Sequence, residues 1–107
     1  MTRRRTHARY QCELNVTFVH EGREHRGVGD NISLGGMFIC TELDLPLAVE
    51  VAVRFEVPES GHEIDATAVV RWHKPSGFGV QFHTLRAREV WALNRWFTKL
   101  ALAEELG

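Results

Sequence analysis

Apolar residues recur at every second position in several short runs of this chain, and turn-forming residues separate the runs. Leu14, Val16 and Phe18 alternate with polar residues within Glu13–His20, and Glu50–Val57 shows the same alternation. Side chains of a β-strand point to opposite faces in turn, so each such run predicts a strand with one buried face. Four further strands are expected at Glu24–Ile32, Met37–Cys40, Glu63–His73 and Phe78–His83.

The end of the chain has a helical pattern instead. Residues 86–105 contain no Pro or Gly, and their apolar side chains recur at the spacing of one helix face. This expected stripe consists of Val90, Leu93, Phe97, Leu100 and Ala101. Thr84 is expected to cap the helix, and Glu89 lies near its positive end. Trp91 and Trp96 are expected to be packing residues.

Six strands followed by one helix predict a mainly all-β fold, namely a small antiparallel β-barrel with a C-terminal α-helix over an open end. The 107 residues suit one domain, which can form a core without metal or disulfide staples. No run of about eighteen apolar residues is present, so no transmembrane helix is expected. The N-terminus does not resemble a secretory signal, and we therefore expect a cytoplasmic protein.

Nothing in the sequence indicates an active site or a metal centre. The two cysteines, Cys12 and Cys40, are far apart and are expected to be free thiols. The six histidines are scattered without the spacing of metal ligands. No nucleophile motif is present either. We therefore expect no catalytic residue, no metal and no cofactor.

Positive charge is concentrated at the N-terminus, although the formal net charge of the chain is −1. Arg3, Arg4, Arg5 and Arg9 all precede the first acidic residue, Glu13. A guanidinium offers a planar fork of donors that fits a phosphate or a guanine edge. In an extended segment Arg5 and Arg9 would point to the same side and could clamp one anionic ligand. Taken alone, the cluster also fits a solvated tail.

A second polar segment lies between the second and third expected strands. Asn31 and Ser33 have short side chains that bond to the backbone or to a purine edge. Gly35 and Gly36 permit a close approach of the backbone to a ligand, or a positive φ. This composition alone also fits an ordinary polar turn.

Together and in this order, the two segments resemble the signature of the PilZ domain family. That signature is RxxxR, followed after about one β-hairpin by [D/N]xSxxG. Residues 5–9 (RTHAR) match the first element, and residues 31–36 (NISLGG) match the second. Residues 69–72 (VVRW) and 79–82 (GVQF) also resemble the closing strands of the family, so the resemblance covers nearly the whole chain.

The resemblance implies a six-stranded barrel of PilZ type that binds the bacterial second messenger cyclic di-GMP on its outer surface. In the family the RxxxR arginines contact phosphates and guanines, which assigns these roles to Arg5 and Arg9. Asn31 and Ser33 would bond to guanine, and the glycines that follow them would let the ligand come close.

Two further residues are candidates for the ligand site. Arg4, just before the motif, is similar to an arginine in family members that bind an intercalated ligand dimer. Trp72 is the best aromatic residue for stacking on a guanine face, although a core or barrel-end position fits it equally well. The number of ligand molecules bound is therefore left open.

We expect residues 1–12 to form a flexible basic arm and residues 13–107 to form the barrel with its helix. The ligand would bridge the arm to the barrel, and the ordered arm would signal to a downstream partner protein. One alternative is a PilZ-like adaptor that acts by protein contacts without ligand. Another is a small-barrel nucleic-acid binder, which the near-neutral charge disfavours. No membrane or nucleic-acid partner is expected, and the oligomeric state is open.

Overall fold

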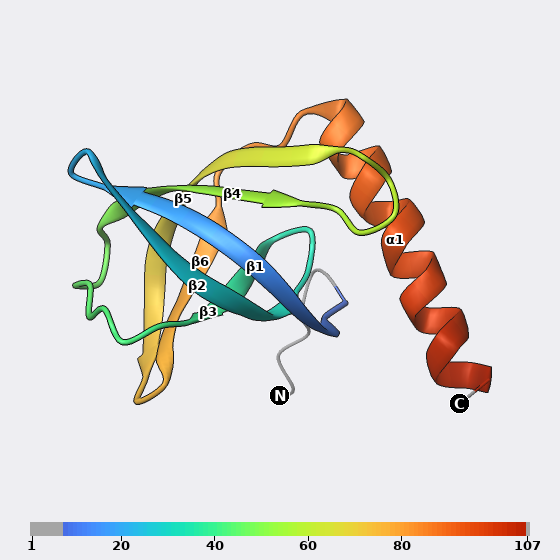
Figure 1. The fold of residues 1–107 in the computed structure, drawn as a ribbon, viewed down its shortest axis with the longest axis horizontal. Helices are drawn as coiled ribbons and strands as arrows, with labels where there is room; N and C mark the ends of the chain where they lie inside the picture. The colour runs from blue at the N-terminus through green and yellow to red at the C-terminus, as the bar shows by residue number, and fades with distance from the viewer. Residues whose placement is uncertain (1–7, 107) are drawn as a thin grey trace, which may run out of the picture.

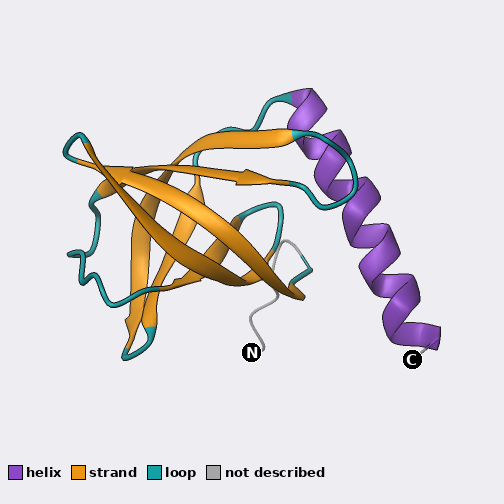
Figure 2. Cartoon of the chain, in the orientation of Figure 1, coloured by secondary structure: helices purple, strands orange, loops and turns teal. Residues whose placement is uncertain are grey.

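Six antiparallel strands close into a barrel, and one helix lies along the end of that barrel (Figures 1 and 2). The computed structural model describes residues 8–106. The strand order around the barrel is β1-β2-β3-β6-β5-β4. The elements are β1 (Tyr10–His20), β2 (Arg23–Ile32), β3 (Gly36–Cys40), β4 (Glu50–Glu56), β5 (Glu63–Lys74), β6 (Gly77–Phe82) and α1 (Ala87–Leu106). The predicted barrel with a C-terminal helix is thereby confirmed.

The core is formed by the apolar residues that alternate with polar residues along the strands. Leu14, Val16 and Phe18 of β1 are buried, and the residues between them are more exposed. β1 pairs with β2 along most of its length and with β4 at Thr17–Val19, and the second pairing closes the barrel. One face of each strand therefore lines a single interior, and the opposite face forms the outer surface.

The first strand is longer than expected. It begins at Tyr10 rather than at Glu13, because Tyr10 and Gln11 pair with Ile32 and Asn31 of β2. Residues 10–12 thus belong to the sheet, although the sequence pattern assigned them to the basic arm. The other strands lie within one residue of their expected bounds.

The helix begins after Arg86, so the expected cap at Thr84 is wrong. The backbone N–H of Arg86 donates to Oε1 of Glu89 at 2.8 Å, and Glu89 N–H donates to the Arg86 carbonyl at 2.9 Å. A glutamate in the first turn that reaches back to the capping residue is one half of a capping box. α1 is not apolar enough to cross a membrane, and no other helix occurs among residues 8–106.

Glu89 also fastens the helix to the barrel. Its Oε2 accepts a hydrogen bond of 3.1 Å from the backbone N–H of Asp65 in β5. β6 ends at Phe82, which pairs with Ala68, so the N–H of Asp65 points past the end of its neighbouring strand. The carboxylate replaces the missing strand partner, and it is buried because the helix covers it.

The buried face of the helix continues the core of the barrel. Leu93 and Phe97 are buried as expected, and Ala92 and Trp96 join them. Of the two tryptophans expected to be packing residues, only Trp96 is buried, because Trp91 is 53% exposed. Its position on the helix, one residue before Ala92, turns its side chain to the outer face.

We predict that Glu89→Ala lowers the free energy of unfolding by about 1–3 kcal/mol, because two backbone donors lose a charged acceptor. Glu89→Gln should cost less, since its amide oxygen can still accept one of the two bonds. Urea denaturation measures both effects. Glu105→Ala, an exposed acid in the last turn, is the control and should stay within about 0.5 kcal/mol. Equal stability of the Glu89→Ala and Glu105→Ala variants would show that the helix is held by its apolar face alone.

Candidate functional site

The pairing register places four residues in a row across the outer face of the barrel. Asn31 of β2 pairs with Phe38 of β3, Phe38 pairs with Gly79 of β6, and Gly79 pairs with Trp72 of β5. Phe38 lies between Met37 and Ile39, which both point into the core. Side chains alternate along a strand, so Phe38 and the residues paired with it belong to the outer face. We call these four residues the outer row.

Glycine at position 79 lets the Trp72 indole lie across β6. A Cβ atom added at Gly79 would overlap the six-membered ring of Trp72. The indole therefore lies against the sheet, and its other face is turned outward. Phe38 is only 2% exposed although it lies outside the core cluster, so the neighbouring outer side chains cover it. Among these neighbours is Lys74, whose Nζ lies 5.1 Å from the centroid of the Phe38 ring.

Arg9 connects the two ends of the outer row. Its Nη1 donates to Oδ1 of Asn31 at 2.5 Å, and its Cζ lies 5.2 Å from the centroid of the Trp72 ring. The next residue, Tyr10, stacks on Phe97 of α1 with ring centroids 4.6 Å apart. Arg9 is thus positioned by the start of β1, by an amide on β2 and by an aromatic ring on β5.

These residues surround an open surface pocket of about 390 Å³. Its lining consists of Arg9, Tyr10, Gln11, Asn31, Phe38, Trp72 and Lys74. Two cations, two amides and three aromatic rings are gathered in one place. This combination suits an anion that carries a flat ring, because guanidinium binds phosphate and an indole stacks on a base.

Sequence reasoning found part of this pocket and missed the rest. It identified Arg9, Asn31 and Trp72, and the structure brings these three together. It missed Tyr10, Gln11, Phe38 and Lys74. Every residue of the run Met37–Cys40 is apolar, so its pattern did not distinguish the outward-facing Phe38 from its core neighbours.

The predicted residues Ser33, Gly35 and Gly36 build the turn after β2. The Ser33 N–H donates to the Gly36 carbonyl at 2.8 Å, and Ser33 Oγ accepts from the N–H groups of Gly35 and Gly36 at 3.0 and 3.2 Å. Ser33 is buried, with 4% of its surface exposed. The Ser33 hydroxyl oxygen therefore stabilises the turn as an acceptor, while the hydroxyl proton can still be donated.

The two glycines of this turn also have roles in the structure. A Cβ atom at Gly36 would overlap the backbone carbonyl of Val80, so the close pairing of β3 with β6 requires glycine there. The carbonyl of Gly35 accepts from the Phe82 N–H at 2.8 Å. Contact of this turn with a ligand stays a prediction. Arg4 and Arg5 lie outside the described residues, and so does most of the expected arm.

The cysteines lie apart from this chemistry. Cys12 Sγ donates to the Gly29 carbonyl at 3.4 Å. Burial, with a smaller contribution from the nearby Asp30 carboxylate, raises the pKa of Cys12 to about 12. The pKa of Cys40 is raised for the same reasons. Both side chains are therefore neutral thiols near pH 7, and neither is an activated nucleophile. Within residues 8–106, no cluster of His, Cys, Asp or Glu could hold a metal ion.

Comparisons with known proteins agree with the fold described above. Eleven chains of solved structures match this chain. One is the structure of the Bacillus subtilis inhibitor of motility, MotI/DgrA, which has 23% sequence identity and a TM-score of 0.73. The match covers 92% of this chain and 54% of that one, so this chain spans about half the length of its structural neighbour. This likeness concerns the fold. No protein with curated annotation matches significantly.

The family assignment comes from the sequence comparison. The sequence model of the PilZ domain matches residues 3–99, which is most of the chain. The match includes both short motifs and all six strands of the barrel. PilZ domains act as receptors and adaptors rather than as enzymes. This chain therefore belongs to the PilZ domain family, a family of cyclic di-GMP receptors.

Proposed function

We propose that this domain binds cyclic di-GMP in the pocket over the outer row and passes the signal to a partner protein. The observation that carries the proposal is the convergence of Arg9, Asn31 and Trp72 on one open pocket from three separate segments. Two of these residues come from the two PilZ motifs, and the third supplies an aromatic face beside them.

Each group in the pocket has a partner in the chemistry of the ligand. Cyclic di-GMP has two phosphates and two guanines, and guanine presents the O6 and N7 acceptors to a guanidinium. The Arg9 guanidinium can bind a phosphate or that edge with two parallel hydrogen bonds. The outward face of Trp72 can stack on a base once the Arg9 guanidinium that lies over it turns to the ligand, and the Asn31 amide can both donate and accept. Lys74 adds a second positive charge at the rim.

The RxxxR motif assigns the remaining ligand contacts to the segment before Arg9. In the proposed complex Arg5 binds the dinucleotide from the side opposite to the barrel, and Arg4 serves a second ligand molecule where two are bound. The bound ligand then holds this segment against the outer row. The surface formed in this way is what a partner protein would recognise.

Arg9→Ala should abolish measurable binding of cyclic di-GMP in titration calorimetry, because it removes the charged donor that reaches both ends of the outer row. Arg5→Ala should do the same. Arg23→Ala, an exposed arginine at the start of β2, is the matched control and should leave the affinity unchanged. Added salt should weaken binding of the unaltered protein, since phosphate contacts are screened.

Two outcomes would contradict this proposal. Unchanged affinity of the Arg9→Ala variant would show that Arg9 does not bind the ligand. If the unaltered protein does not bind cyclic di-GMP, the remaining function is that of a PilZ-like adaptor, which acts by protein contacts and needs no ligand.

Gly79→Ala should weaken ligand binding about as much as Trp72→Ala does, because the added methyl group pushes the indole off its seat on β6. Loss of base stacking costs roughly 1–3 kcal/mol per base, which is about a 5- to 150-fold loss of affinity. The double variant should show little further loss, since both changes remove the same contact. Calorimetry of the four proteins measures this cycle. Fully additive losses would show that Gly79 and Trp72 contribute to ligand binding independently.

Ser33→Ala should lower stability more clearly than affinity. The hydroxyl accepts from two backbone N–H groups in a buried turn, so its removal should cost about 1–3 kcal/mol of unfolding free energy. Affinity for cyclic di-GMP should fall by less than it does in Arg9→Ala, because one neutral hydrogen bond contributes only about 0.5–1.5 kcal/mol. Denaturation and calorimetry on the same sample separate the two effects. A variant with unchanged stability but no binding would assign Ser33 to the ligand alone.

A further inference from the structure

Trp91 is a large aromatic residue exposed on the outer face of α1. Its side chain is 53% exposed, but its ring does not stand alone. The Arg95 guanidinium lies 4.9 Å from the ring centroid, and His62 packs against the ring edge-on at 5.7 Å. The indole is therefore held in place at the surface, which lowers the entropy lost when a partner covers it.

A groove runs beside Trp91, between α1 and the turn that joins β4 to β5. Figure 1 shows this turn curling beside the first half of the helix. The groove has a volume of about 250 Å³, and the buried residues Ala92 and Trp96 lie at its base. A second hollow of about 280 Å³ shares His62 with it and continues to Arg88. We call the two hollows together the helix groove.

Positive charge follows the helix side of the groove. Arg88, Trp91, Arg95 and Lys99 are spaced by three or four residues and therefore lie on one face of α1. Arg88, Arg95 and Lys99 form no ion pair with any carboxylate in the described part of the chain. Three cations and an exposed tryptophan thus border a groove whose base is formed by the apolar residues Ala92 and Trp96. Arginine and tryptophan are the residues most enriched at binding hot spots.

We propose that the helix groove docks an acidic segment of a partner protein. One apolar side chain of that segment would sit between Trp91 and Trp96, and its carboxylates would pair with Arg88, Arg95 and Lys99. Charge complementarity of this kind speeds encounter and fixes the register of the docked segment.

The same charges argue against other occupants. A two-fold contact with a second copy would set this face against itself and bring like charges together. A nucleic acid or an anionic membrane is a broader polyanion that would also cover the sheet side of the groove. That side carries Glu59 and Glu63, so the positive charge is confined to the helix side, where a narrow acidic segment can lie without covering both sides.

The helix groove is in contact with the ligand pocket through packed aromatic rings. Trp96 packs on Phe97 with centroids 5.7 Å apart, and Phe97 stacks on Tyr10 in the wall of the pocket. Docking itself needs no ligand, so its test is done without cyclic di-GMP. Failure of that test leaves the receptor proposal intact.

The experiment is an NMR titration of the isotope-labelled full chain. The probe is a short synthetic peptide rich in Glu around one central Phe, and the comparison peptide has Gln in place of each Glu. The indole N–H signals of Trp91 and Trp96 should shift with the acidic peptide, while the signal of Trp72 should not. The variant Trp91→Phe identifies the first of these signals.

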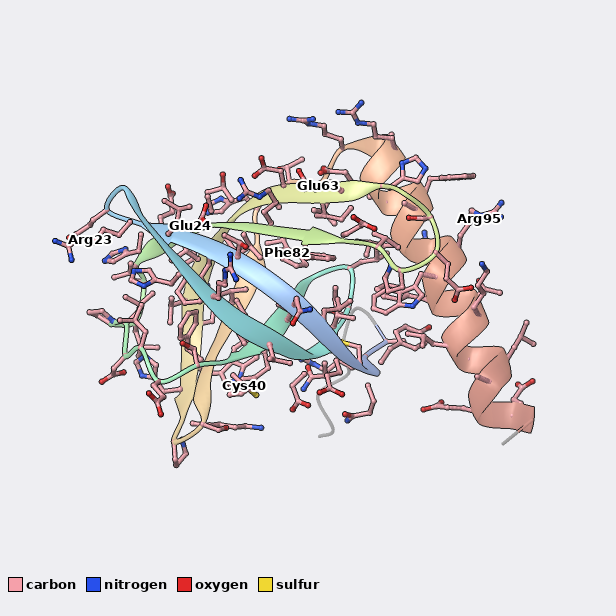
Figure 3. The ribbon with its side chains drawn as sticks, in the orientation of Figure 1. Arg23, Glu24, Cys40, Glu63, Phe82 and Arg95 are labelled. Atoms are coloured by element: carbon pink, nitrogen blue, oxygen red, sulfur yellow. The ribbon has the colours of Figure 1, made fainter. Side chains whose placement is uncertain are left out.

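Charge reversal tests the basis of the contact. Arg95→Glu together with Lys99→Glu should weaken peptide binding by at least about tenfold, since like charges then face each other. Arg23→Glu is the matched control, and Figure 3 shows Arg23 and Arg95 at opposite ends of the molecule. Its affinity for the peptide should equal that of the unaltered protein.

Several outcomes would overturn the proposal. These are no shift at Trp91 and Trp96, equal binding of the Gln peptide, or an equal effect of Arg23→Glu. Sedimentation that reveals a dimer lost in Trp91→Ala would assign the groove to a second copy. Shifts at Trp91 caused by duplex DNA or phosphatidylglycerol vesicles, but not by the acidic peptide, would assign it to a polyanion.

Discussion

The candidate site depends on the hydrogen-bonded register of four neighbouring strands. Pairing of β2, β3, β6 and β5 brings Asn31, Phe38, Gly79 and Trp72 into one line. A shift of one residue in any pairing would turn the moved side chains to the other face. The buried alternate residues prevent such a shift, because it would expose the core. The outer row therefore takes its position from the interior, and Arg9 completes it by joining the two ends.

Much of the fold could be predicted from the sequence because its signals are local. Alternation at every second position identified β1, β4 and β5, turn residues that bound short runs indicated the other three strands, and helical spacing identified α1. Barrel closure is less local, yet six short antiparallel strands with one buried face leave few other ways to bury that face. The candidate site was partly predictable for another reason. Arg9 and Asn31 belong to two short motifs whose order and spacing resemble a known family.

The features that sequence reasoning missed depend on contacts between distant segments. Thr84 looked like a cap, but Glu89 caps the helix at Arg86 because the same carboxylate also bonds to β5. Trp91 is a large aromatic residue of the kind that often packs, but it lies on the face of the helix turned away from Ala92, Leu93 and Trp96, which contact the barrel. The Ser33 oxygen accepts two hydrogen bonds within its own turn, which is one of the two uses that the sequence allowed, and its contact with a ligand stays a prediction. In each case a local pattern was compatible with two environments.

The docked position of Arg9 has a consequence for the sensitivity of the proposed receptor. Its guanidinium already holds the amide and covers the indole that a guanine would approach, so an incoming molecule competes with an internal occupant. The apparent affinity is then the intrinsic affinity reduced by the fraction of chains in which the site is free. Substitutions at Asn31 or Trp72 would alter that fraction together with the direct contacts. In the proposed receptor this competition would raise the concentration of cyclic di-GMP that is needed for binding.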